Sequence, residues 1–85
     1  MRAKNISRYT YKKTAFQGWR LALRRQGEQF VKYFADRQYE DSTAAFKAAV
    51  ALRNDILKEL KKGTAPSVVF AAARELTRQN QTEEE

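Results

Sequence analysis

Hydrophobic and polar residues alternate along two neighbouring stretches that are joined at a glycine. The first stretch contains an apolar set and a largely cationic set at alternate positions: Trp19, Leu21 and Leu23, and Arg20, Ala22 and Arg24. Successive side chains of a strand point to opposite faces, so this stretch predicts a strand with an apolar inner face and a cationic outer face. Residues 28–34 continue the pattern beyond Gly27 and predict a second strand and a β-hairpin.

The turn at Gly27 decides which residues of the second strand face outward. A type I turn that starts at Arg24 and closes with a glycine bulge makes a three-residue loop. The alternative, a two-residue loop at Gln26 and Gly27, would put Lys32 beside Leu21 on the buried side. A register change of one residue moves every side chain across the sheet, and we therefore favour the bulged loop.

The bulged loop predicts a definite set of cross-strand pairs. The outer pairs are Arg24 with Glu28, Ala22 with Phe30, and Arg20 with Lys32, and the inner pairs are Leu21 with Val31 and Trp19 with Tyr33. Tyr33 and Phe34 are adjacent and cannot both point inward in a regular strand, and the pattern leaves open which is buried. A further strand is predicted from Ile6 to Tyr11, with its register open because neither alternating set is cleanly apolar.

Helical periodicity begins after the hairpin. From Ser42 to Lys62 the apolar residues recur every three or four positions, as in the row Ala45, Ala49, Leu52, Ile56 and Leu60. Asp41 or Ser42 can cap the first turn, and Gly63 is a natural stop. The apolar row of the helix should lie on the apolar face of the sheet, because neither element can otherwise bury its apolar side.

A second, shorter helix is predicted after Pro66, which the first turn of a helix tolerates. With about three turns it would be marginal alone, so it should dock on its own domain or on a partner. Self-association would use four apolar residues of this helix: Val69, Phe70, Ala73 and Leu76. The polar, acidic residues that follow predict a mobile tail.

Together these elements predict an α+β fold, with a three-stranded antiparallel sheet packed on one long α-helix and a short additional C-terminal helix. Residues 1–62 would form the sheet-plus-helix domain, residues 63–79 a linker and accessory helix, and residues 80–85 a disordered acidic tail. The 85-residue chain has no cysteine and no histidine, which excludes a disulfide framework and the usual ligands of a structural zinc site. The core must hold by packing alone.

Charge is concentrated in the predicted sheet. The chain has a formal net charge of +7, and residues 1–39 carry ten Lys and Arg against Glu28 and Asp36. A polyanionic partner is therefore expected, with nucleic acid favoured over anionic membrane because the basic residues lie on strands. No apolar run suits a membrane span or a secretory signal, so a cytoplasmic protein, nucleoid-associated if bacterial, is expected.

The sequence offers little for catalysis. A general base would have to be Asp, Glu, Lys or Tyr, and no paired carboxylates or glycine-rich phosphate loop are present. We expect no enzyme activity, no cofactor, no metal and no small-molecule substrate. The candidate DNA-contacting residues are the cations of the hairpin and the loop with one outward aromatic: Lys12, Lys13, Arg20, Arg24, Phe30 and Lys32. Phe30 could contact a thymine methyl group or stack on an unpaired base.

A pattern of short motifs runs from Ile6 to Leu57: residues 6–8, Gly18-Trp19 opening a strand, the glycine turn, residues 33–39 and an alanine-rich helix. In this order it resembles the bacterial and phage relatives of the Apetala-two/ethylene-response-factor (ERF) DNA-binding domain.

The resemblance implies that the exposed face of the sheet enters the DNA major groove, with Arg24 and Phe30 at positions that approach DNA in that family. It also implies a DNA contact from the first strand, for which Arg8 is the best candidate. Ala22 stands where plant members have glutamate and Glu28 where they have arginine, so their base preference is not carried over.

The resulting hypothesis is a double-stranded DNA-binding protein that acts in transcriptional regulation or in a mobile element. Within nucleic-acid binding, an integrase arm-site-like module or a single-strand or RNA binder that uses Phe30 and Tyr9 stays open. From another class, the protein could be an interaction adaptor that acts through its C-terminal helix.

Overall fold

The computed structural model describes residues 2–13 and 15–84, with side chains for residues 2–13 and 15–76. Three strands form one antiparallel sheet in the order β1 (Ile6–Tyr11), β2 (Phe16–Arg25) and β3 (Glu28–Ala35). A short 3₁₀ helix, η1 (Asp36–Gln38), leads into α1 (Ser42–Lys61), and α2 (Pro66–Glu84) follows. The predicted α+β fold, with its three-stranded sheet and long helix, is confirmed.

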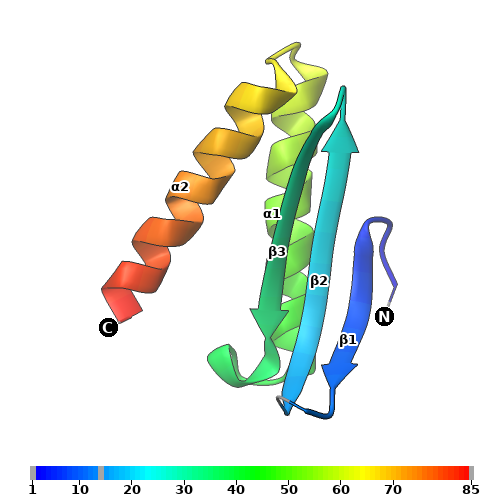
Figure 1. The fold of residues 1–85 in the computed structure, drawn as a ribbon, viewed down its shortest axis with the longest axis vertical. Coiled ribbons are helices and arrows are strands. Elements are labelled where there is room, and N and C mark those ends of the chain that lie inside the picture. Colours follow the sequence, from blue (N-terminus) through cyan, green and yellow to red (C-terminus); the bar gives the residue numbers. More distant parts are fainter. Residues whose placement is uncertain (1, 14, 85) are drawn as a thin grey trace.

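The helices and the sheet form two layers. In Figure 1, α1 runs along one face of the sheet, and α2 starts beside the end of α1 and diverges from it. The core lies between the layers, where Leu21 and Leu23 of β2 meet Ala45 and Ala49 of α1. We call the opposite side of the sheet the outer face; its side chains include Tyr9, Tyr11, Phe16, Arg20, Ala22, Arg24, Gln29, Val31 and Tyr33.

The hairpin between β2 and β3 has a two-residue loop. Gln26 and Gly27 have φ angles of 49° and 81°, and Arg25 pairs with Glu28 directly across the turn. Positive φ at both central residues is the type I′ geometry, whose twist matches that of the flanking strands. The predicted bulged loop is therefore wrong, and the pairing of β3 with β2 differs by one residue from the predicted register.

This shift exchanges the two faces of β3. Phe30 and Phe34 lie in the core with 1% and 3% of their surface exposed, whereas Val31 and Tyr33 lie on the outer face with 37% and 43% exposed. The predicted outward position of Phe30 and the inward positions of Val31 and Tyr33 are thus wrong. Of the adjacent pair Tyr33 and Phe34, the buried residue is Phe34.

The sequence pattern favours the bulged loop because the other register turns Lys32 toward the helix. Lys32 pairs with Leu21 and so lies on the helix-facing side, where burial of a charge would be costly. However, β3 is an edge strand, and the Lys32 ammonium lies 5.0 Å from the centre of the Phe34 ring. A lysine at a sheet edge can cover apolar surface with its stem while its charge stays near water.

Local contacts fix α1 against the sheet. The Asp41 carboxylate caps the helix by accepting a hydrogen bond of 2.8 Å from the Ala44 amide. Trp19 donates from Nε1 to the Ser42 carbonyl at 2.9 Å and packs edge-on against Phe46. The predicted cap and the predicted core position of Trp19 are confirmed.

Gly18 allows β2 and β3 to lie close together beside Trp19. A Cβ atom at this position would stand 2.3 Å from the Phe34 carbonyl oxygen and 2.7 Å from the Phe16 ring. Only glycine avoids these contacts. Glycine is therefore required here because no Cβ atom fits, and not because of its backbone angles.

The C-terminal helix docks on its own chain. Val69, Phe70 and Ala73 are buried in the same core as the sheet, and the rings of Phe70 and Phe30 have centroids 6.0 Å apart. Three of the four residues expected for self-association therefore face inward, and Leu76 is 54% exposed. The helix extends to Glu84; the predicted acidic tail at residues 80–85 falls where no side chains are described, and its mobility stays a prediction.

Candidate nucleic-acid interface

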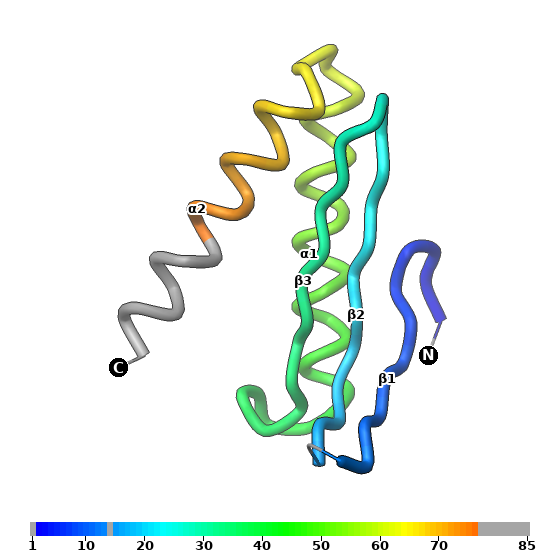
Figure 2. The backbone as a smooth tube through the Cα atoms, in the orientation of Figure 1, coloured from blue at the N-terminus to red at the C-terminus, as the bar shows by residue number. Residues whose placement is uncertain are grey.

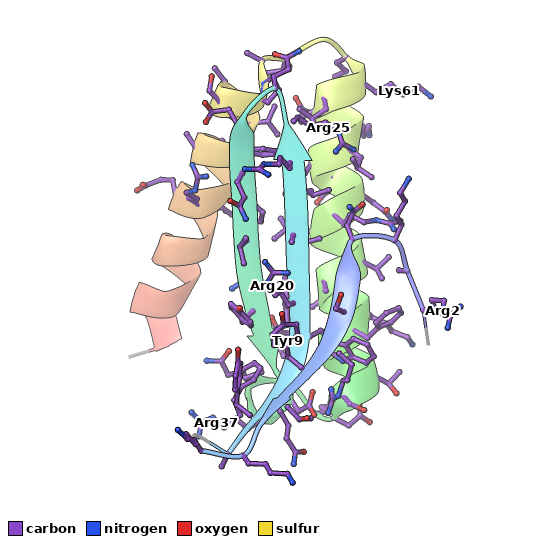
Figure 3. The ribbon with its side chains drawn as sticks, turned by 45° about the vertical axis from the view of Figure 1, so that its right-hand side comes forward. Arg2, Tyr9, Arg20, Arg25, Arg37 and Lys61 are labelled. Carbon is purple, nitrogen blue, oxygen red and sulfur yellow. The ribbon has the colours of Figure 1, made fainter. Side chains whose placement is uncertain are left out.

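Two arginines of the central strand lie on the outer face. They alternate with the core residues Leu21 and Leu23, so strand geometry alone turns Arg20 and Arg24 outward. Arg20 lies over Tyr9 of β1, with 5.7 Å from its guanidinium carbon to the ring centre, and Figure 3 shows both residues on the sheet. Arg24 is exposed and stands opposite Gln29.

No carboxylate faces outward from the three described strands. Glu28 was expected opposite Arg24, but it stands opposite Arg25, on the helix-facing side. The two ion pairs found among the described residues involve neither Arg20 nor Arg24. The predicted surface pair of Arg24 and Glu28 is wrong, and the positive charge of the outer face is more uniform than the sequence suggested.

Four aromatic rings gather at the end of the outer face near the turn between β1 and β2. We call this set, Tyr9, Tyr11, Phe16 and Tyr33, the aromatic end. Tyr33 contacts Tyr9 and Phe16 edge-on, with centroids 5.8 and 5.7 Å apart, and Tyr9 lies 5.8 Å from Tyr11. Edge-to-face packing leaves the two most exposed rings, Tyr11 and Tyr33, with accessible surface for another planar group.

Sequence reasoning missed most of this aromatic end. Tyr33 was expected on the inner face and Phe16 lay outside the predicted strands, whereas Phe16 begins β2 and pairs with Tyr11. The two-residue hairpin loop would have placed Tyr33 outward beside Arg20. Ile6 of β1 joins the core, and side chains alternate along the strand. Tyr9 and Tyr11 therefore lie on the outer face, the same face as Tyr33.

The two loop lysines lie close to the aromatic end in the fold. Lys12 and Lys13 are exposed in the turn that follows β1 and precedes β2. Tyr11 of the aromatic end is their neighbour in the chain. Their position extends the positive charge beyond the strands.

Arg8 belongs to the other side of the sheet. It pairs with Trp19 and donates two hydrogen bonds to Asp36, at 2.8 and 2.6 Å, while its guanidinium lies 5.0 Å from the Trp19 ring centre. The hydrogen bonds to the Asp36 side chain raise the pKa of Arg8 above its usual value. Arg8 thus links β1 to the segment after β3 and lies on the helix-facing side, away from the face expected to contact DNA.

Four of the seven predicted contact residues lie on or beside the outer face: Lys12, Lys13, Arg20 and Arg24. Phe30 is in the core, and Lys32 and Arg8 lie on the helix-facing side.

The sheet narrows toward the hairpin. Pairing with β1 ends where Ile6 meets Leu21, and the Asn5 carbonyl accepts one further bond from the Ala22 amide at 2.9 Å. Beyond that point β2 and β3 continue as a two-stranded ribbon, as Figure 2 shows. Arg24 lies on this ribbon, opposite Gln29. The ribbon also carries Ala22, Val31 and Gln29 on its outer side.

A separate groove lies between the two helices, away from the outer face. Its volume is about 300 Å³, and it is lined mainly by apolar residues of α1 and α2, including Leu52, Ile56, Val68, Ala72 and Leu76. Asp55 and Glu59 of α1 stand at the same groove. This is the feature that the adaptor alternative would use.

Comparisons with protein-family models, curated proteins and solved structures give no match to the chain. The resemblance to the ERF-type DNA-binding domain therefore stays a prediction. Over their described residues, neither α1 nor α2 combines the length and apolarity of a membrane-spanning helix.

Proposed function

We propose that this chain binds double-stranded DNA with the outer face of its sheet, and that the ribbon of β2 and β3 enters the major groove. The observation that carries the proposal is the pair Arg20 and Arg24 on a face whose described strands present no carboxylate. Arginine makes paired hydrogen bonds to guanine or to phosphate, and both occur on duplex DNA.

The dimensions of the sheet are compatible with the groove. Neighbouring strands are about 4.8 Å apart, so three strands span about 10 Å between their axes, against a major-groove width of about 12 Å. The ribbon that carries Arg24 is narrower still, with two strands. Proteins that place a β-ribbon in the major groove use this geometry.

Duplex binding should depend on Arg24 much more than on its neighbour Arg25. We expect Arg24→Ala to weaken binding to a mixed-sequence duplex by about 5- to 150-fold, the equivalent of about 1–3 kcal/mol. Arg25→Ala removes the same charge from an exposed residue on the helix-facing side and should cost much less. Fluorescence anisotropy with a labelled duplex at several salt concentrations measures both.

The salt series gives a second readout. If Arg20, Lys12 and Lys13 each neutralise one phosphate while Arg24 contacts a base, the slope of log affinity against log salt should be about −2.7. Equal losses in Arg24→Ala and Arg25→Ala, or no duplex binding at low salt, would contradict the proposal.

A second candidate, binding of single-stranded DNA or RNA, is favoured by the aromatic end. Exposed rings next to cations form stacking platforms for unpaired bases, each worth about 1–3 kcal/mol. In that case Tyr33→Ala should weaken binding of a single strand by about 5- to 150-fold, and Tyr33→Phe should retain it.

The same anisotropy assay with single-stranded competitors separates the candidates. Stronger binding to single strands than to duplex, together with the loss in Tyr33→Ala, would favour the second candidate. A circular dichroism melt of each variant shows whether the fold is kept.

A further inference from the structure

An apolar pair interrupts the charged part of the outer face. Ala22 and Val31 stand directly opposite each other on β2 and β3. The pair on the hairpin side is Arg24 with Gln29, and the pair on the other side is Arg20 with Tyr33. Val31 is 37% exposed, so its methyl groups face solvent between two arginine positions instead of joining the core.

This pair has the chemistry that recognises a methyl group. Neither side chain can form a hydrogen bond or an ion pair, so neither suits phosphate or a polar base edge. In the major groove, thymine is distinguished by its C5 methyl, and small apolar side chains contact it. Ala22 is also short, which allows the backbone of the ribbon to approach the bases closely.

The strand spacing places the pair at a defined distance from Arg24. Residues on one face of an antiparallel strand repeat about every 7 Å, which matches about two base-pair steps of 3.4 Å. A base contacted by Arg24 and a base contacted by Ala22 and Val31 would therefore lie about two base pairs apart.

We infer that Ala22 and Val31 read thymine methyl groups, and that the preferred duplex carries thymine about two base pairs from a guanine bound by Arg24. This inference rests on the proposed duplex binding through the outer face. Phe30, which the sequence suggested for contact with a thymine methyl, is buried, and the observed register turns Ala22 and Val31 outward in its place.

Removal of single methyl groups from the DNA tests the inference. The 85-residue chain first selects its preferred duplex from a random library, and each thymine of that duplex is then replaced singly by uracil, which pairs identically but lacks the methyl. We expect one or two of these replacements to weaken binding about fourfold, as for one buried methyl-sized group. A duplex with 5-methylcytosine at such a position should be bound more tightly, by a similar factor, than a duplex with plain cytosine at the same position.

Protein variants connect the effect to the pair. In Val31→Ser the penalty for the critical uracil should fall to less than about twofold, because a hydroxymethyl group offers less apolar contact. Val68→Ser is the matched control, since Val68 is an exposed valine on α2, and it should keep the fourfold penalty.

The outcomes separate this inference from the proposed function. If no uracil replacement weakens binding while Arg24→Ala still does, Val31 serves only strand formation and the inference is overturned, although duplex binding stands. Equal uracil penalties in Val31→Ser and Val68→Ser would overturn the inference in the same way. No duplex binding at low salt would overturn both the inference and the proposed function.

Discussion

Replacement of Phe70 by alanine is expected to lower the free energy of unfolding by about 3–5 kcal/mol. Phe70 is fully buried on α2 and its ring lies beside that of Phe30 on β3. A chain of 85 residues has a total stability of about 4–12 kcal/mol, so this loss could unfold a large share of the molecules. Urea titration followed by circular dichroism at the helical minimum measures the change.

Val68→Ala is the control for Phe70→Ala. Val68 is on the same helix, two residues away, and is 59% exposed. Its truncation should change stability by at most about 0.5 kcal/mol. If both variants unfolded at the same urea concentration, α2 would not be docked in solution. Its apolar residues would then be available to a partner, as the adaptor alternative requires.

Trp19→Ala should have an effect of similar size, about 3–5 kcal/mol. Its indole joins β2 to α1 and to β1. It packs on Phe46 of α1 with centroids 4.8 Å apart, donates a hydrogen bond to the Ser42 carbonyl at the start of the same helix, and lies beside the Arg8 guanidinium of β1. Truncation removes the apolar contact and leaves that carbonyl without its side-chain donor. Thermal melting by circular dichroism is the appropriate measurement, since Trp19 is the chain's single tryptophan and its fluorescence is lost with it.

The variant Trp19→Phe divides this effect into packing and hydrogen bonding. Phenylalanine keeps most of the ring contact with Phe46 but cannot donate to Ser42, and the loss of that bond should cost about 1–3 kcal/mol. A cost as large as that of Trp19→Ala would mean that the hydrogen bond dominates and that the packing argument is incorrect.

The sequence predicted the elements well because each depends on local chemistry. Asp41 caps α1, Gly63 follows its end, and alternation along β2 separates Leu21 and Leu23 from the arginines. None of these features depends on how the hairpin turns. The faces of β2 were therefore correct even though the loop was not.

The errors lie on β3, where the faces depend on pairing, and the faces of β1 had to be left open for the same reason. A shift of one residue at Gly27 moved Phe30 and Lys32 inward and Tyr33 outward. Sequence alone favoured the other register because a lysine on the helix-facing side looked costly, and the fact that β3 is an edge strand reduces that cost. For Arg8, the attraction of Asp36, 28 positions away, was not visible in any local pattern.

The position of Gly18 and the strict alternation of β2 have a consequence for how this protein could diverge. Odd-numbered residues from Trp19 to Leu23 face the core, and even-numbered residues from Arg20 to Arg24 face outward. Recognition could thus be rewritten at every second position of one strand while stability stays with the positions between them. Gly18 is the exception, since it belongs to the outward series yet admits no side chain, and any redesign of specificity must leave it unchanged.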